Sequence, residues 1–585
     1  PFNSTPTFAR MDPRPSGAVR LKLDADEGFR SLVVLARVMC ADGRLGAQGL
    51  SNVLHALASM HARGVLSVDG DATNLRGLVA ALERATPRLS KKMTSQAAAN
   101  AIWALATMRW ELGADAWDAL EAAVVRLGGA RGSMNGQEVA NVLWAYATFG
   151  WDLAEETWSA LDGAVTSVAG GGGGGGGTEN DNGSNGSDSS VSSSGYGRNR
   201  FPKHYDPGGD ARTAMSARAV ANALWGFATL GRRPSPAAWK ALERTMIRTS
   251  DTMNAHDVCN VWWSYVTLES SPSLPAARDA LEAATARLTR TMASKDVANV
   301  TWALSMLPRD APPPQESTLT AIERAEVRLA GSMRARDVAS ALLGHATNAG
   351  RRRRLSTASG ADAWDSLSDA VGRVGHEMSY EDVSNILWAH AVIGASPSEG
   401  AVRAIERAIV RLGGGGGGGG PIVVAPKETS NVFYAYARLG LDPGDDALKA
   451  LDAAVETSAS SMNAQACSIT LWSVVALAAT RGTRLPGCYV TLWDAASKLD
   501  PASFLDANWC AFFHASMIHA ELLEARDDDG DGDDDDDGDD GDDGGGGGEM
   551  RALLRAARAN YPAWLEARSM HWSPYDRVGV VNADP

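Results

Sequence analysis

The sequence has few cysteines, and their placement excludes two kinds of site. The five cysteines in the 585 residues are scattered, at positions 40, 259, 467, 488 and 510, without a CxxC spacing or a Cys/His pairing. This distribution argues against a zinc site or a disulfide framework and favours a reducing compartment. No apolar stretch is long enough to span a bilayer, so we expect no membrane insertion.

Residue patterns typical of catalytic sites are also absent. No Ser/His/Asp, paired-carboxylate or metal-ligand constellation recurs or stands apart from the repeat described below. Neither long glycine run is followed by the Lys-Ser/Thr of a phosphate-binding loop. The Asp/Gly-rich tract lacks the ordered ligands of a calcium-binding loop. We therefore expect no enzymatic activity, no metal, no cofactor and no small-molecule substrate.

The negative charge of the chain is concentrated in one segment. The formal net charge is −15, but Asp527 to Asp543 alone contributes thirteen aspartates, and the remainder carries about −2. Since most of the chain is nearly neutral, the choice of partner depends on where its charges lie.

A repeated motif is the main feature of the sequence, and it is clearest as MNGQEVANVLWAYATFG at Met134–Gly150. Asn222, Asn260 and Asn299 mark successive copies 38 and 39 residues apart. A repeat of this length is one supersecondary unit that must stack on its neighbours to bury its apolar face. The motif Asn, or the residue in its place, lies at positions 52, 100, 141, 222, 260, 299, 340, 385 and 431, with degenerate copies at Ile469 and near Trp509.

Each repeat predicts two helices. The first helix begins after a polar cap such as Asn135, Asn254, Ser294, Ser379 or Asn463, often with an acid three residues later. Many copies end at a glycine, at Gly150, Gly231, Gly350, Gly394 and Gly440. The second helix, such as AWDALEAAVVRL from Ala116, is rich in helix-forming residues with apolar spacings of three and four. Strand signals are absent, so we predict an all-α solenoid of about eleven helical hairpins.

Insertions divide the array. We expect a disordered lead (1–28), N-terminal repeats (29–169), a Gly/Ser-rich linker (170–212) and further repeats (213–526). An Asp/Gly-rich insertion (527–548) and a terminal helix and tail (549–585) follow. A solenoid tolerates such added length between its helices.

Two positions of the motif have both a structural and a functional interpretation. Asn in mid-helix is unfavourable, and because it hardly varies we expect it to bond backbone at the junction between repeats. The Trp three residues later recurs in seven repeats, with Leu343 and Tyr434 in its place elsewhere. A row of aromatic rings can stack on bases, but the substitution by Leu343 favours packing between repeats.

A third position, four residues before the Asn, is polar in the ten repeats from Gln48 to Gln465, yet its identity changes. A position of this kind can read a different nucleotide in each repeat, or it is simply a solvated residue of the first turn. The base-facing candidates are Gln96, Gln137, Arg218, His256, Lys295, Arg336, Glu381, Lys427 and Gln465, with Gln48 in the first repeat.

A stripe of arginines recurs near the end of the second helix. Cations are favourable at helix C-termini, which explains part of the stripe. Repeated along a stacked array, it also suits contact with phosphates. The phosphate candidates are Arg88, Arg126, Arg248, Arg287, Arg328, Arg373 and Arg411.

The core Q-x-x-A-N-x-L-W-A-x-A-T-x-G, clearest at Gln137–Gly150, resembles the octotricopeptide repeat family over most of the chain. The resemblance implies an α-solenoid that binds organellar RNA and acts in its processing, stability, splicing or translation, with other RNA-processing proteins as further partners. The family resembles FAST-kinase-like proteins, which often end in a RAP domain. No RAP domain is recognisable in residues 549–585.

We therefore expect a non-enzymatic protein that binds single-stranded RNA in the chloroplast or the mitochondrial matrix. The alternative is an armadillo-like scaffold for protein–protein interaction, which the nearly neutral body and the modest basic stripe leave open. A groove lined by both the arginines and the variable residues would favour RNA, whereas an acidic or apolar groove would favour the scaffold.

Overall fold

The computed structural model describes residues 26–64, 66, 75–129, 133–170, 215–352, 358–413, 424–481, 485 and 487–528. Most of the expected lead, linker, Asp/Gly-rich insertion and tail lies outside these residues. The described residues form 22 α-helices and no strand. The chain is therefore an all-α solenoid, as the repeat period predicts.

The motif residues form one set of helices, which we call A helices. Their bounds are α2 (Ala47–Ala62), α4 (Ser95–Met108), α6 (Gly136–Phe149), α8 (Ala217–Thr229), α10 (Ala255–Thr267), α12 (Ser294–Met306), α14 (Ala335–Arg352), α16 (Tyr380–Ile393), α18 (Pro426–Leu439), α20 (Ala464–Arg481) and α22 (Asp506–Asp528).

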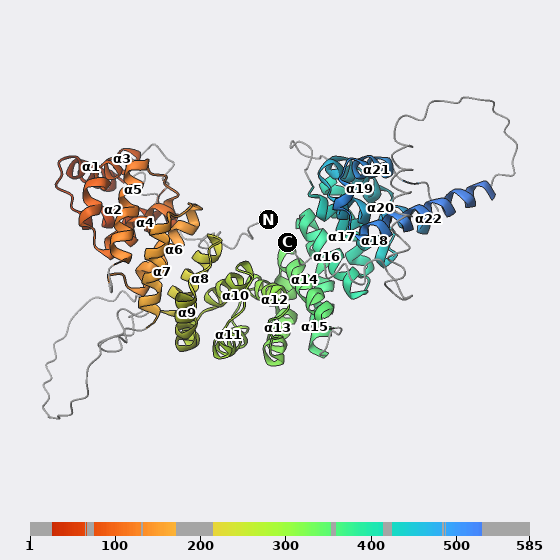
Figure 1. Ribbon diagram of the computed structural model, residues 1–585, viewed down its shortest axis with the longest axis horizontal. Coiled ribbons are helices and arrows are strands. Elements are labelled where there is room, and N and C mark those ends of the chain that lie inside the picture. The colour runs from red at the N-terminus through yellow and green to blue at the C-terminus, as the bar shows by residue number, and fades with distance from the viewer. Residues whose placement is uncertain are drawn as a thin grey trace. The chain divides into compact units, whose positions relative to one another are not determined.

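The second helix of each repeat belongs to another set, the B helices, which alternates with the A helices along the chain (Figure 1). Their bounds are α1 (Glu27–Ala41), α3 (Leu75–Leu89), α5 (Ala114–Gly128), α7 (Glu155–Ala169), α9 (Pro236–Thr249), α11 (Pro275–Leu288), α13 (Glu316–Leu329), α15 (Ala358–Val374), α17 (Glu399–Gly413), α19 (Gly444–Ser458) and α21 (Cys488–Ser497).

The helices belong to two compact blocks, and the chain passes from one to the other at Ala284/Thr285, within α11. In each block, A helices pack side by side on A helices and B helices on B helices. The result is a layer of A helices against a layer of B helices, in which each repeat touches mainly its neighbours, as expected for a solenoid.

The core lies between the two layers. Tyr146 of α6 and Tyr265 of α10 are almost fully buried and meet Trp117 and Trp239 of the B layer edge to face, with ring centroids 5.2 and 5.5 Å apart. The edge-to-face arrangement is favourable for aromatic rings beyond the area that they bury.

Most of the predicted helix boundaries are confirmed. Asn135, Asn254 and Ser379 are N-caps, and Gly150 and Gly394 end their helices with φ near +70°, where only glycine is free of strain. Two expectations were wrong. Ser294 is the first residue of α12 rather than its cap. The helix α14 continues past Gly350 to Arg352, since arginine is a good helix former.

Candidate nucleic-acid interface

The variable polar residue has the same place in every A helix from α4 to α20. It is the second helical residue, and its side chain is exposed in each of these repeats except at Gln465, which is half-buried. The local cause is the cap: Thr94 accepts a hydrogen bond from the backbone N–H of Ala97, and Ser216 accepts one from Ala219. The cap fixes the first turn and with it the outward direction of the next side chain.

The acid that follows the variable residue is used within the helix. Glu138 accepts a hydrogen bond from the backbone N–H of Asn135 at 2.9 Å, and Asp257 accepts one from Asn254 at 3.1 Å. Burial raises the pKa of Asp257, although the hydrogen bond from Asn254 and the charges of Arg218 and His256 lower it. These carboxylates therefore turn away from solvent and leave the exposed surface to the variable residue.

The motif Asn lies one turn further along the same face. Asn52 accepts a hydrogen bond from Gln48 Nε2 at 2.9 Å, and Asn260 Nδ2 lies 3.3 Å from Nε2 of His256. We expected the Asn to bond backbone at the junction. In these two repeats the amide instead contacts the variable residue of its own helix, four positions earlier, so that expectation was wrong for them.

The rings at the motif Trp position contact one another between neighbouring A helices within each block, and we call them the aromatic row. Ring centroids are 6.4 Å apart for Trp144–Trp225, for Trp225–Trp263 and for Tyr434–Trp472, and His55, at the same place in the first repeat, lies 5.1 Å from Trp103. Packing between repeats is thereby confirmed. Trp225 and Trp263 are buried, but Trp103, Trp144, Tyr434 and Trp472 are half-buried and His55 is exposed, so part of each of these rings remains open to a ligand.

The expected linker does not interrupt this row. The helix α6 packs directly on α8, and the Trp144–Trp225 distance equals that of the next pair. Gly226 makes the close approach possible, since a Cβ there would lie 3.0 Å from the backbone of Leu143. The face of the A helices therefore passes from α6 to α8 at the same spacing as between α8 and α10.

The arginine stripe lies beside the turns that lead from B to A helices, where its guanidinium groups contact backbone. Arg126 Nη2 donates to the carbonyl oxygens of Ser90 and Met93 at 3.2 and 3.0 Å. Arg248, Arg328, Arg373 and Arg411 make equivalent bonds to the preceding repeat. These bonds add a charged donor to carbonyls at helix ends and in the turns that follow them. The sequence alone did not indicate this contact with the preceding repeat, and the contact with phosphates stays a prediction.

An acid of the B helix makes the opposite connection, to the next repeat. Gly113, the N-cap of α5, donates its N–H to Glu83 at 2.6 Å, and Ser235, the N-cap of α9, donates to Asp162 at 2.8 Å. The first N–H of α21 donates to Asp452 at 2.8 Å. Carboxylates are favourable at helix N-termini, so the acid and the arginine connect each B helix to both neighbours.

The arginine contact can be tested at one junction. Arg373→Ala removes bonds of 2.8 and 2.6 Å to the carbonyls of Ala330 and Met333, so we expect a loss of roughly 1.5–3 kcal/mol in the free energy of unfolding. Arg373→Lys should recover part of it, because an ammonium lacks the planar fork of donors. Urea denaturation measures both variants.

The matched control is Arg403→Ala, which breaks only an exposed pair with Glu399 on one helix. We expect that variant to change stability by less than about 0.5 kcal/mol. Equal effects of Arg373→Ala and Arg403→Ala would contradict the role of Arg373 in the junction.

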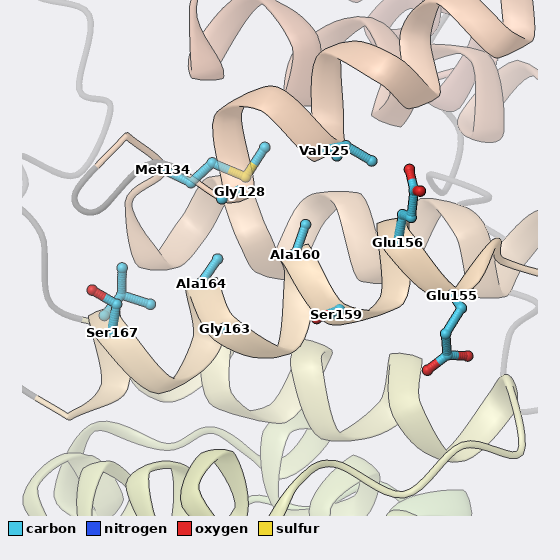
Figure 2. Close-up of a pocket in the computed structure, with 12 residues that line it drawn as sticks. Val125, Gly128, Met134, Glu155, Glu156, Ser159, Ala160, Gly163, Ala164 and Ser167 are labelled. Carbon is cyan, nitrogen blue, oxygen red and sulfur yellow. The ribbon is translucent and has the colours of Figure 1, made fainter.

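A groove of about 690 Å³ lies on the B layer, between α5 and α7. Figure 2 shows Ala160, Gly163 and Ala164 along α7 facing the side of Val125 and Gly128 of α5. Glu155 and Glu156 lie at the N-terminal end of α7, and Glu155 pairs with Arg232 at 2.8 Å. The groove is apolar, with an acidic end, and it is separate from the face of the A helices.

Other kinds of site have no counterpart in the described part of the chain. Within those residues, no three His, Cys, Asp or Glu side chains are grouped to hold a metal ion, and no helix there is long and apolar enough to cross a membrane. The five cysteines are buried and free. Burial raises the pKa of Cys467 to about 12, so this thiol is unsuited to act as a nucleophile.

Comparison with known proteins gives no relative. No family model matches the chain, and no curated protein does. Among known structures it is similar to a homology model of the full-length AP-3 complex in an intermediate open conformation, at 9% identity, with a TM-score of 0.31, covering 95% of this chain and 92% of that one. A crystal structure of an engineered protein gives 8% identity, a TM-score of 0.17, and coverage of 80% and 98%. Similarity this low carries no argument about function, so a functional assignment depends on the geometry of the chain itself.

Proposed function

We propose that the protein binds single-stranded RNA along the exposed face of its A helices. The observation that carries the proposal is the register of the variable residue. It is the second residue of each A helix from α4 to α20, it is exposed or half-buried, and it lies one turn before the motif Asn and two turns before the aromatic row. Helical repeats of other proteins read one base each with two or three side chains, and this face repeats such a set.

The chemistry of the face suits bases more than phosphates. Half-buried rings offer surfaces on which bases stack, while amides, cations and one carboxylate offer different hydrogen bonds to base edges. Four of the ten variable residues are Lys or Arg and one is Glu, so the face is slightly basic in a nearly neutral body. The protein would act by occluding or remodelling a transcript, without bond chemistry.

The biological setting follows from the octotricopeptide resemblance. Under this proposal the RNA is an organellar transcript, in the chloroplast or the mitochondrial matrix, and the protein controls its processing, stability or translation. Other RNA-processing proteins would be further partners.

RNA binding is tested with two double variants that remove the same charge. Lys295→Gln with Arg336→Gln changes the A-helix face, whereas Arg324→Gln with Arg407→Gln changes exposed positions of B helices. We expect the first pair to weaken binding to a randomised single-stranded RNA pool about tenfold or more, because removing one polar interaction typically reduces affinity by about a factor of ten. The second pair should have little effect.

The measurement is fluorescence anisotropy at several salt concentrations, since affinity for nucleic acids has meaning only at a stated ionic strength. Equal losses of affinity in both double variants would indicate non-specific attraction. No binding of the intact chain at low salt would overturn the proposal.

The groove between α5 and α7 supports a second candidate, an interaction scaffold. Its small apolar lining, with Glu156 at one end, suits an amphipathic helix that carries basic residues. Gly163→Leu would fill the groove. If the chain is a scaffold, this variant should weaken the binding of a basic amphipathic helical peptide, and the face variants of α12 and α14 should not.

A further inference from the structure

The repeat of α14 differs from its neighbours at the positions that face the proposed ligand. Its variable residue is Arg336, but Ser340 stands where other repeats have Asn, and Leu343 stands where they have Trp. The repeats on either side have the complete sets Lys295, Asn299, Trp302 and Glu381, Asn385, Trp388.

This difference is chemical and leaves the fold of the repeat intact. The helix α14 packs on α12 and on α16 in the same layer as the other A helices. Arg336 is the second residue of the helix and is exposed, and Ser340 and Leu343 are half-buried like the residues at the same places in the two neighbouring repeats. A ligand along the face would therefore lie as close to this repeat as to its neighbours, but it would contact Ser340 and Leu343 in place of Asn and Trp.

The role of the missing amide is visible in two other repeats. The side chain of Gln48 bonds Asn52 at 2.9 Å, and the amide nitrogen of Asn260 lies 3.3 Å from the ring of His256. A long exposed side chain loses conformational entropy when a ligand orders it. An amide that already orders the side chain reduces that cost and fixes which hydrogen bonds point outward. In these two repeats the Asn is thus a positioning residue for the variable side chain, and the inference below extends this role to the repeats that have both residues.

Ser340 and Leu343 cannot supply these functions in the same way. A serine hydroxyl is shorter than an asparagine amide and does not offer a separate donor and acceptor at its far end. A leucine side chain has no aromatic surface on which a base can stack, so the row of rings has a gap between Trp302 and Trp388.

We infer that the repeats read RNA through the combination of variable residue, Asn and aromatic ring, and that the repeat of α14 does not discriminate between bases. This inference rests on the proposed function. The preferred RNA then contains one position without base preference, flanked on both sides by selected positions. The repeat at Ile469 also lacks the amide but retains Trp472, so its nucleotide is stacked and weakly selected.

The experiment is selection from a randomised RNA pool with three forms of the full chain. The unchanged chain should give a motif with one internal unselected position. Ser340→Asn with Leu343→Trp completes the set in α14, and about tenfold base preference should appear there. Asn299→Ser with Trp302→Leu adds a second gap at α12, so the neighbouring position should also lose its preference while the other selected positions keep theirs.

Circular dichroism and thermal unfolding show whether each variant folds, and Ser340→Asn alone gives a milder second test of gained preference. A selected base at the α14 position of the unchanged chain would overturn the inference and leave RNA binding standing. So would a completed set that gains no preference. Absence of RNA binding by the intact chain would instead overturn the proposed function, and the inference with it.

Discussion

Glu326→Ala is expected to lower the free energy of unfolding of the C-terminal block by about 3–5 kcal/mol, the usual cost of removing one partner from a buried ion pair. Glu326 is fully buried in α13, 2.6 Å from Nε2 of His345 in α14 and 2.6 Å from the hydroxyl of Thr301 in α12. Without the carboxylate, a buried imidazole and a cavity remain. Urea denaturation measures the loss, and hydrogen exchange should place it in α12 to α14.

A double variant separates the cost of leaving His345 without its partner from the cost of the lost side-chain volume. Glu326→Val with His345→Leu introduces residue types that other repeats have at these places, such as Val371 and Leu304. Thr301 keeps its bond to the carbonyl oxygen of Val297. Well-packed apolar residues often match or exceed a buried ion pair in stability, so the double variant should be at least as stable as the unchanged chain. A loss as large as that of Glu326→Ala would contradict this account.

The same pair predicts a pH dependence. Burial lowers the pKa of His345, but the charge of Glu326, its hydrogen bond and the charge of Glu323 outweigh burial and raise that pKa above its usual value. The pair therefore contributes stability that is fully present below the ordinary histidine pKa of about 6.5 and is lost as pH rises through the folded-state pKa. The stability difference between the unchanged chain and the double variant should shift accordingly between acid and alkaline pH.

Glu243→Ala is expected to cost at least about 3 kcal/mol in the N-terminal block, because five hydrogen bonds to one buried carboxylate are lost, two of them from the buried side chains of Trp239 and Tyr265, at roughly 1–3 kcal/mol for each buried donor. Glu243 of α9 is almost fully buried. Its carboxylate accepts hydrogen bonds from the N–H and hydroxyl of Ser273, both at 2.6 Å, and from the N–H of Leu274 at 3.0 Å. It also accepts bonds from Trp239 and from Tyr265.

The matched control lies at the same register three repeats earlier. Glu83 accepts one bond, from the N–H of Gly113, at an exposed junction, so Glu83→Ala should cost only about 0.5–1.5 kcal/mol. Thermal and urea unfolding of both variants give the comparison. Equal costs would show that the burial of Glu243 and the number of its donors are unimportant, which would refute the explanation.

Much of the fold follows from local sequence. The period near 38, the caps Asn135 and Ser379 and the terminal glycines Gly150 and Gly394 predict the helices because capping and apolar spacing act within a few residues. The errors at Ser294 and Gly350 are also local, since more than one neighbouring residue can cap or end a helix.

The contacts of the charged stripes could not be predicted in the same way. Arg373 bonds carbonyls 40 and 43 residues earlier, and Glu243 accepts from N–H groups 30 and 31 residues later. The regular recurrence of an acid and an arginine in the B helix was the available signal. It indicates that the positions matter, but not whether backbone, solvent or a ligand occupies them.

By itself, the sequence determined the repeat, the two-helix pattern and the exposed register of the variable residue, because these depend on helical periodicity and on caps close in the chain. Only the tertiary structure decided that the arginines and acids of the B helices bind neighbouring helix ends, and that Glu326 meets His345 in the core. Those partners come from different turns or different repeats, and the stacking of helices determines which groups share one site and which of them remain accessible to a ligand.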